Sequence, residues 1–252
     1  MDFTDKTILI TGGSRGIGRA TAQAFAKRGA KVAINFQKDS EAASATIDSL
    51  EGEGHFAIKA DIGRPDAVER MIAAVVKEMG RLDIVVNNAG IFFPHRVDKV
   101  NYKEWQQAWH ETLKINLLGA ANICYCVAQV MIGQGGGRII NVSSRGAFRG
   151  EPEQPAYGAS KAGLNALSQS LAQSLAPHQI FVAVVAPGFV ETDMTKAMLD
   201  GPEGAEIKQQ SPTGRVAKPE EVANGILFLA SEGAEFMTGG ILDINGASYL
   251  RS

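Results

Sequence analysis

The segment PAYGASKAGL, residues 155–164, places a phenol and a primary amine four residues apart, at Tyr157 and Lys161. A spacing of four puts two side chains on one face of a helix, about one turn apart. A free phenol has a pKa of about 10, and a cation held nearby favours the phenolate and moves that pKa toward neutral pH. The pair therefore predicts a proton donor or acceptor, although Tyr-x-x-x-Lys alone would also arise as a chance amphipathic pair.

Two polar segments are expected beside this pair. Ser144 follows the predicted strand 138–143, and the segment Asn87–Gly90 begins at the end of the predicted strand 82–87. Because the carboxyl ends of parallel strands meet at one edge of a sheet, ligands bind in the crevice beyond that edge. A hydroxyl group, the amides of NNAG and the Tyr157–Lys161 pair are thus expected in one crevice, which favours a catalytic site over a chance pairing.

The glycine-rich segment TGGSRGIG, residues 11–18, follows the first predicted strand and opens the first predicted helix. Glycines let the backbone approach a pyrophosphate closely, and the free N–H groups of a helix N-terminus attract its charge. The spacing of Gly12, Gly16 and Gly18 differs from the G-x-G-x-x-G fingerprint, so the segment alone would also fit a tight turn without a ligand. Its place between a strand and a helix favours a phosphate cradle.

The second predicted strand ends without a carboxylate. In dinucleotide-binding folds an acidic side chain about 20 residues after the glycines holds the ribose 2′-hydroxyl. Asn35 or Phe36 stands at that place here, and Arg15 and Lys38 would pair with a 2′-phosphate through charge-assisted hydrogen bonds. We therefore expect NADP(H) in preference to NAD(H), with a solvated surface charge as the alternative reading of Lys38.

Short apolar strands alternate with helices along the chain. The predicted strands are 6–10, 31–35, 55–60, 82–87, 138–143, 181–186 and 240–244, each rich in Ile and Val, as in strands buried on both faces. Strand, helix, strand in repetition gives parallel pairing with right-handed crossovers. The predicted fold class is α/β, a doubly wound Rossmann-type parallel sheet of about seven strands with helices on both faces. Residues 1–252 are expected to form one domain, and its second helix to begin on a capping serine, Ser40.

Composition excludes several classes of protein. The 252 residues are 45% hydrophobic and 21% charged with a formal net charge of -2, so the chain lacks the basic excess typical of nucleic-acid binding. The N-terminus has no cationic leader, and no stretch reaches the roughly 20 apolar residues of a membrane span, so we expect a cytoplasmic protein without a membrane partner. Cys124 and Cys126 are expected to be buried free thiols, and no metal site is predicted.

Together the motifs resemble those of the short-chain dehydrogenase/reductase family. TGGSRGIG, Asp61–Ile62, NNAG, the asparagine of LKINLLG, NVSS, YGASK and APGFVET occur in the family order along essentially the whole chain. The sequence is also similar to the 3-oxoacyl-[acyl-carrier-protein] reductases within that family. The resemblance implies oxidoreductase activity with a nicotinamide cofactor that carries hydride.

The resemblance also implies a role for each motif residue. Tyr157 would be the general acid or base, Ser144 would hydrogen-bond the substrate oxygen, Lys161 would bind the nicotinamide ribose and lower the pKa of Tyr157, and Asn116 would hold a proton-relaying water. The expected cofactor contacts are Gly12, Ser14, Arg15, Gly16, Ile17, Gly18, Asn35, Phe36, Asp61, Ile62, Asn88, Ala89, Gly90, Tyr157, Lys161, Pro187, Gly188, Val190 and Thr192.

The substrate side is less well defined by the sequence. Three irregular segments, 91–103, 145–155 and 187–217, are expected to wall the substrate site. Their candidate pocket residues are Phe92, Phe93, His95, Phe148, Arg149, Phe189, Met194 and Met198, of which His95 and Arg149 are candidate anchors for a negatively charged group. For each of them, packing within the loop is the alternative. The segment between NNAG and Asn116 is about four residues longer than in similar family members, about one helical turn.

Partners are inferred from two helices. Residues 117–132 are apolar nearly all round, so they must be covered on more than one face. The resemblance implies a homotetramer, and a lid within one monomer is the alternative. The segments MIGQGGG and LAPHQ at the helix ends carry no strong cationic patch, so docking of an acidic carrier protein is doubtful, and His178 is expected to be a surface residue.

We therefore predict an NADP(H)-dependent carbonyl reductase or secondary alcohol dehydrogenase acting on a small-molecule ketone or secondary alcohol, of 3-oxoacyl type by resemblance. Three alternatives stay open. The first is a non-catalytic NADP(H)-binding regulator, against which the complete set of Tyr, Lys, Ser and Asn argues. The second is an NAD-dependent dehydrogenase of a small or cyclic alcohol. The third is a sugar-nucleotide epimerase or dehydratase, which would need a larger C-terminal region than the chain has after Gly240.

Overall fold

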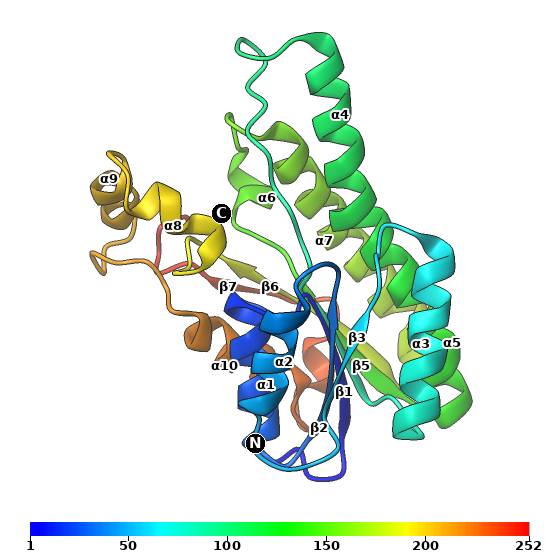
Figure 1. The fold of residues 1–252 in the computed structure, drawn as a ribbon. Helices are drawn as coiled ribbons and strands as arrows, with labels where there is room; N and C mark the ends of the chain where they lie inside the picture. The colour runs from blue at the N-terminus through cyan, green and yellow to red at the C-terminus, as the bar shows by residue number, and fades with distance from the viewer. Residues whose placement is uncertain (252) are drawn as a thin grey trace.

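A parallel sheet forms the centre of the computed structural model, which describes residues 1–251 (Figure 1). Within these residues the strands are β1 (Thr7–Thr11), β2 (Lys31–Phe36), β3 (Phe56–Lys59), β4 (Ile84–Asn87), β5 (Gly137–Val142), β6 (Ile180–Pro187) and β7 (Ile241–Ile244). Their order is β3-β2-β1-β4-β5-β6-β7, and every neighbouring pair is parallel. The order reverses between β1 and β4, which is where such a sheet opens a crevice for ligands.

Helices cover both faces of the sheet. They are α1 (Gly16–Ala26), α2 (Ser40–Asp48), α3 (Pro65–Met79), α4 (Tyr102–Leu113), η1 (Lys114–Gly119), α5 (Ala120–Gln134), α6 (Gly146–Arg149), α7 (Pro155–Leu175), η2 (Ala176–His178), α8 (Asp193–Leu199), α9 (Gly204–Gln209), α10 (Pro219–Ala230) and η3 (Glu235–Met237). Helices α1, α2 and α10 lie on one side of the sheet, and α3 and α5 lie on the other (Figure 1).

Two hydrophobic cores hold these layers together. Successive side chains of a strand point to opposite faces, so Ile8 and Ile10 of β1 join the core under α1 and α10, whereas Leu9 between them joins the core under α3, α5 and α7. All three side chains are fully buried. Burial on both faces explains the continuous apolar runs that identified the strands, and the fold class is confirmed.

The boundaries differ from the predicted ones in small, explicable ways. Each strand lies within two residues of its predicted range. The second helix is capped one residue earlier than expected, because the side chain of Asp39 accepts a hydrogen bond of 2.9 Å from the Ala42 amide, and Ser40 is the first helical residue. The predicted irregular segments contain short helices: α6 lies in the second and α8 and α9 lie in the third.

The helical run Tyr102–Gln134 is long and apolar enough to cross a membrane by length and composition alone. It is continuous over α4, η1 and α5, and an 18-residue window reaches a mean hydropathy of 1.6. Ile123, Val127 and Met131 of this run are fully buried against the sheet. A core helix of a soluble fold passes the same test of length and composition, so the run is not by itself a membrane segment.

The two cysteines lie on α5 and are unpaired. Burial raises the pKa of Cys124 to about 12, so its thiol is inert at neutral pH. Cys126 is only half-buried, which corrects the expectation that both thiols are buried. Among residues 1–251 no three His, Cys, Asp or Glu side chains gather in a way that would hold a metal ion.

Candidate functional site

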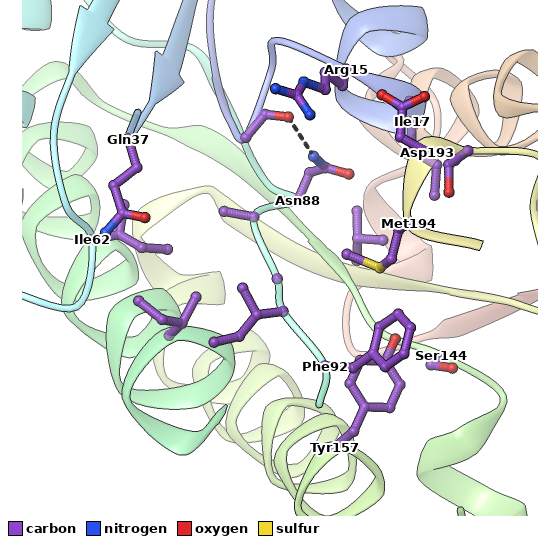
Figure 2. A pocket seen from close by; sticks show the side chains of 18 of the residues that line it. Arg15, Ile17, Gln37, Ile62, Asn88, Phe92, Ser144, Tyr157, Asp193 and Met194 are labelled. Atoms are coloured by element: carbon purple, nitrogen blue, oxygen red, sulfur yellow. Dashed lines mark hydrogen bonds between the residues drawn. The ribbon is translucent and has the colours of Figure 1, made fainter. Parts of the chain in front are cut away.

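A cavity of about 850 Å³ opens at the carboxyl edge of the sheet. All the residues predicted to contact a cofactor line it except Gly18, and Ser144 lines it too. Figure 2 shows its two ends: Tyr157, Phe92 and Ser144 gather at one, and Gln37 and Ile62 lie at the other. The length of the cavity between these ends suits an extended ligand.

The glycine-rich turn forms one wall through its backbone. Gly12 and Gly16 have φ of +62° and +50°, a region that side chains rarely adopt. A Cβ on Gly18 would lie 2.2 Å from the Gly12 carbonyl oxygen, so only glycine permits the turn to close there. Gly18 therefore shapes the cradle from behind rather than lining it.

The Asn88 segment fixes this turn in place. The Asn88 side-chain amide donates to the carbonyl oxygens of Thr11 and Gly12 at 3.0 and 3.1 Å, and Figure 2 draws one of these bonds as a dashed line. The backbone amides of Asn88 and Ala89 donate to the Thr11 hydroxyl, each at 3.1 Å. Thr11 was not singled out in the sequence, although its place as the last residue of the first strand, facing the NNAG segment, was a usable signal.

The far end of the cavity has no carboxylate from β2. Asn35 is buried, and its amide donates to the Ala60 carbonyl at 3.0 Å, so its role is to join β2 to the end of β3. Gln37 lines the cavity just beyond Phe36 and was missed in the sequence. Lys38 also lines the cavity, at an exposed position.

Arg15 is held by an acidic neighbour at this end. Its guanidinium donates to Asp39, the residue that caps α2. The backbone Ala42 amide and the Arg15 guanidinium together hold the pKa of Asp39 below its usual value, so the carboxylate is ionised at neutral pH. The sequence prediction that Arg15 pairs with a 2′-phosphate did not include this ion pair.

Tyr157 and Lys161 lie on one face of α7, as their spacing predicts. The Lys161 Nζ is 5.7 Å from the centroid of the Tyr157 ring and donates to the Val142 carbonyl at 2.8 Å. Burial lowers the pKa of Lys161 to about 8. The amine therefore changes charge near neutral pH, which is unusual for lysine.

The electrostatics of Tyr157 differ from the prediction. Burial raises the pKa of its phenol above the usual value, and a hydrogen bond with the Ser144 hydroxyl opposes that rise only in part. The charge of Glu151 also raises this pKa, and no lowering by Lys161 is found. The pair is close enough for proton transfer, but the pKa of the Tyr157 phenol is not lowered toward neutral pH in this structure.

Asn116 lies in the π-helical turn η1 between α4 and α5. Its side chain makes two hydrogen bonds with the Ile91 backbone, accepting from the amide at 2.9 Å and donating to the carbonyl at 2.8 Å. A Cβ on Gly90 would lie 3.4 Å from the Lys161 Nζ and 3.5 Å from the Asn116 Oδ1, so these three residues meet at one point. π-Helical turns are rare and occur often at functional sites.

The opposite wall comes from the chain after β6. Pro187, Gly188, Val190 and Thr192 all line the cavity. A Cβ on Gly16 would lie 3.0 Å from the Thr192 side chain, so this wall reaches across to the glycine-rich turn. The cavity is therefore bounded by segments that are far apart in the sequence.

The predicted substrate residues divide into two groups. Phe92, Phe93 and Met194 line the cavity, and the Phe92 ring packs edge-on against Tyr157 with centroids 6.2 Å apart. The others lie outside it. The rings of Phe148 and Phe189 pack under the guanidinium groups of Arg251 and Arg145, respectively. Arg149 is exposed on α6, and Met198 is half-buried on α8. The prediction that the candidate residues of all three segments line one pocket is thus only partly confirmed.

His95 is not a substrate anchor. Its side chain is 1% exposed, Nδ1 lies 2.6 Å from the Phe93 carbonyl oxygen, and Nε2 accepts from the Ala156 amide at 3.1 Å. The imidazole therefore joins the 91–95 segment to the first turn of the helix that carries Tyr157. Nothing in the sequence around His95 indicated that its side chain would link these two segments.

A Rossmann-type sheet with a glycine-rich turn and a Tyr-Lys-Ser-Asn site defines a class of nicotinamide-dependent oxidoreductases. The chain belongs to the short-chain dehydrogenase/reductase family, and it is an NAD(P)-dependent oxidoreductase that interconverts carbonyl and CH–OH groups. The family model that matches, over residues 12–247, is described as Enoyl-(Acyl carrier protein) reductase.

Named relatives and a solved structure match nearly the whole chain. The chain is 39% identical to the 3-oxoacyl-[acyl-carrier-protein] reductase FabG of Escherichia coli, over 99% of this chain and 100% of the relative. It is 37% identical to the enzyme of the same name from Staphylococcus epidermidis, over 98% of this chain and 100% of the relative. A crystal structure described as gox2181 is 33% identical, with a TM-score of 0.91 over 98% of this chain and 96% of that one.

Proposed function

We propose that this protein reduces the keto group of 3-oxoacyl compounds with NADPH as the hydride source. The observation that supports this most is the meeting of Tyr157, Lys161 and Ser144 at one end of the cavity, with a glycine-rich cradle along the same cavity. The names of the relatives indicate the substrate class.

The residues present fit a dinucleotide cofactor. The close backbone approach at Gly12, Gly16 and Gly18 leaves room for a pyrophosphate, and the N-terminus of α1 would attract its charge. Lys161, Asn88 and Thr192 would contact the nicotinamide half. When bound, NADPH supplies the hydride.

The preference for NADPH over NADH rests on charge. No carboxylate stands at Asn35 or Phe36 to repel a 2′-phosphate, and Arg15 and Lys38 lie at the same end of the cavity. Arginine binds phosphate through paired hydrogen bonds. NADH would keep its hydroxyl at this place and gain nothing from either cation.

The chain's own residues would bind the ketone and move the proton. The substrate carbonyl oxygen would lie between the hydroxyls of Ser144 and Tyr157, which both face the cavity. Tyr157 would donate its proton to the oxygen that becomes the alcohol. Lys161 beside it would favour the resulting phenolate. Asn116, whose side chain is fixed by hydrogen bonds to the Ile91 backbone, would hold the proton-relaying water next to Lys161.

The mouth of the cavity suits an acyl chain. Phe93 and Met194 line the cavity and are 43% and 49% exposed, so apolar surface surrounds the entrance. Such surface would bind the alkyl part of a 3-oxoacyl thioester and release water on doing so. Neither His95, which is buried, nor Arg149, which lies outside the cavity, would anchor a free carboxylate there.

The test is reduction of acetoacetyl-coenzyme A, followed by the absorbance of NADPH. We expect turnover with NADPH, weaker turnover with NADH, and a loss of about 10²–10⁴-fold in kcat for Tyr157→Phe with unchanged NADPH binding. Tyr102→Phe is the matched control, because Tyr102 is 74% exposed on α4 and outside the cavity.

Other outcomes would select the alternatives. Cofactor binding without turnover of any ketone or alcohol would indicate a regulator. Turnover of a cyclic alcohol with NAD+ alone would indicate an NAD-dependent dehydrogenase. Reduction of crotonyl-coenzyme A at its double bond, without ketone reduction, would agree with the family description and overturn the proposal.

We also propose a cytoplasmic homotetramer. Leu118, Tyr125 and Ile132 lie on the run from η1 to α5 and are 57%, 67% and 39% exposed, although the opposite face of this run is buried in the core. A sister subunit would cover them, and light scattering at micromolar concentration measures this directly. The sparse cationic charge near Gln134 and His178 argues against docking of an acidic carrier protein, which remains a proposal.

A further inference from the structure

A second cavity, of about 260 Å³, lies behind the wall of the main cavity. It is bounded by the first residue after Ser144, the segment 207–217 and the turn that follows β7, and none of its lining residues lines the main cavity. Phe189 lines this cavity, whereas its neighbours Gly188 and Val190 line the main one. The two cavities are therefore separated by one stretch of backbone.

Arg145 brings a buried positive charge to this second cavity. The residue is 4% exposed, its guanidinium lies 5.0 Å from the centroid of the Phe189 ring, and Nη2 donates to the neutral amide of Gln210. No carboxylate of residues 1–251 forms an ion pair with it. Burial and the charge of Arg149 lower its pKa, and Glu151 opposes them only in part. Arginine is almost never buried unless it is paired. A buried Arg145 without a carboxylate partner is therefore unusual.

The other charges around the cavity are already paired. Arg215 makes two hydrogen bonds of 2.7 Å with Glu221. Asp243 accepts one of 2.7 Å from Arg251 through Oδ2, whereas its Oδ1 is buried without a hydrogen-bond partner. Of the charged groups that line the cavity, Arg145 is the one without an ion pair among residues 1–251. Because the carboxylates of Glu221 and Asp243 also line the cavity, they would repel a dianion such as phosphate more strongly than a monoanion.

The remaining walls provide apolar surface and hydroxyl groups. Ile207, Val216 and Ile244 supply the apolar part, and the Ser248 hydroxyl is buried without a hydrogen-bond partner. Guanidinium groups bind carboxylates through two parallel hydrogen bonds, and no side chain of residues 1–251 accepts a hydrogen bond from Nε or Nη1 of Arg145. A carboxylate with a short alkyl chain matches both parts of the cavity.

We propose that this cavity is a binding site for a short-chain monocarboxylate, held by Arg145. The site would be coupled to the main cavity, because Arg145 follows Ser144 directly and its backbone amide donates to the Pro187 carbonyl at 2.9 Å. Occupancy would fix Phe189 under the guanidinium and so restrain the wall formed by Gly188 and Val190. The inference does not depend on the identity of the ketone substrate.

The test uses butyrate as the probe and the full-length protein. Isothermal titration should show binding of butyrate but not of 1-butanol, which has the same chain without the charge. Arg145→Gln should weaken butyrate binding by at least tenfold. Arg70→Gln, which removes an exposed arginine of α3 that lines neither cavity, should leave it unchanged.

Hydrogen exchange locates the bound probe without any substitution. Butyrate should slow amide exchange in residues 207–217 and 245–248, and Tyr157→Phe should not alter that effect. Absence of butyrate binding, equal binding by Arg145→Gln and the parent protein, or protection confined to the main cavity would each overturn the proposal. If Arg145→Gln fails to fold, Arg145→Lys tests the same point, since it keeps the charge but loses the paired hydrogen bonds, and binding should weaken.

Discussion

The two ends of the main cavity are built by different means. At the cofactor end, backbone atoms make the surface: glycines with positive φ, and amides and carbonyls fixed by Thr11 and Asn88. At the substrate end, side chains make it: Phe92, Phe93 and Met194 extend from irregular segments or a short helix. A backbone surface tolerates almost no added atom, whereas a side-chain surface can be remodelled by substitution.

This difference indicates that the cofactor end of the cavity is rigid and that the substrate end can be varied by substitution. The cofactor end binds a constant molecule, so a fixed shape serves it. The substrate end determines which ketone enters, and loops on a rigid scaffold are the usual means of varying that. Changes at the cofactor end should therefore abolish binding, and changes at the substrate end should shift kinetics by modest factors.

Gly18→Ala should have the largest effect. The new Cβ would lie 2.2 Å from the Gly12 carbonyl oxygen and 2.7 Å from the Asn88 amide nitrogen, so the cradle must open. We expect cofactor affinity, measured by NADPH fluorescence, to fall at least about 100-fold, as when close backbone contacts to a ligand are lost. Gly133→Ala is the control, because its Cβ would meet nothing within 4 Å. Normal NADPH binding by Gly18→Ala would contradict the view of a rigid cradle.

The same contrast explains how much the sequence could predict. Glycines, NNAG and the Tyr157–Lys161 spacing imply local backbone shapes or a helix face, and the sheet order then brings them together without further information. His95 and Arg15 were misjudged for the opposite reason. Their partners, Ala156 and Asp39, are determined by how loops and helix ends pack, and neither spacing nor composition reports that packing.

His95→Ala should have an intermediate effect. It removes the link between the Phe93 carbonyl and the Ala156 amide, so Phe92 would lose its fixed place against Tyr157. We expect kcat/KM to fall about tenfold and the free energy of unfolding to fall by about 1–3 kcal/mol, as for a buried donor left without its partner. His95→Gln, which can donate and accept hydrogen bonds, should restore part of kcat/KM.

Two further measurements separate positioning from general damage at His95. Cofactor affinity should be unchanged in His95→Ala, because the cofactor end does not depend on this link. His178→Ala, an exposed control, should leave all three quantities unchanged. A loss of cofactor affinity equal to the loss of kcat/KM would show that the two ends are not independent.

The pH dependence of the free energy of unfolding tests whether Lys161, between the two ends of the cavity, is buried. Between pH 8 and 10.5 the native protein has lost a proton that the unfolded chain still holds, because burial lowers the pKa of Lys161 from 10.5 to about 8. The free energy of unfolding should therefore rise with pH over 8–9.5, by up to about 1.4 kcal/mol per pH unit. Urea unfolding should show this rise in the parent protein relative to Lys161→Met. Equal slopes would mean that Lys161 titrates normally.

Asp39→Asn should have the smallest effect and the most specific one. Asparagine can still cap α2 through its side-chain oxygen, but it no longer neutralises Arg15, so the guanidinium becomes free for a 2′-phosphate. We expect NADPH affinity to rise about two- to fivefold, the scale of an exposed ion pair, and NADH affinity to stay constant. Asp48→Asn makes the same change of charge at the other end of α2 and should leave both affinities constant. An equal gain for NADPH and NADH would show that net charge, rather than release of Arg15, determines binding at this end.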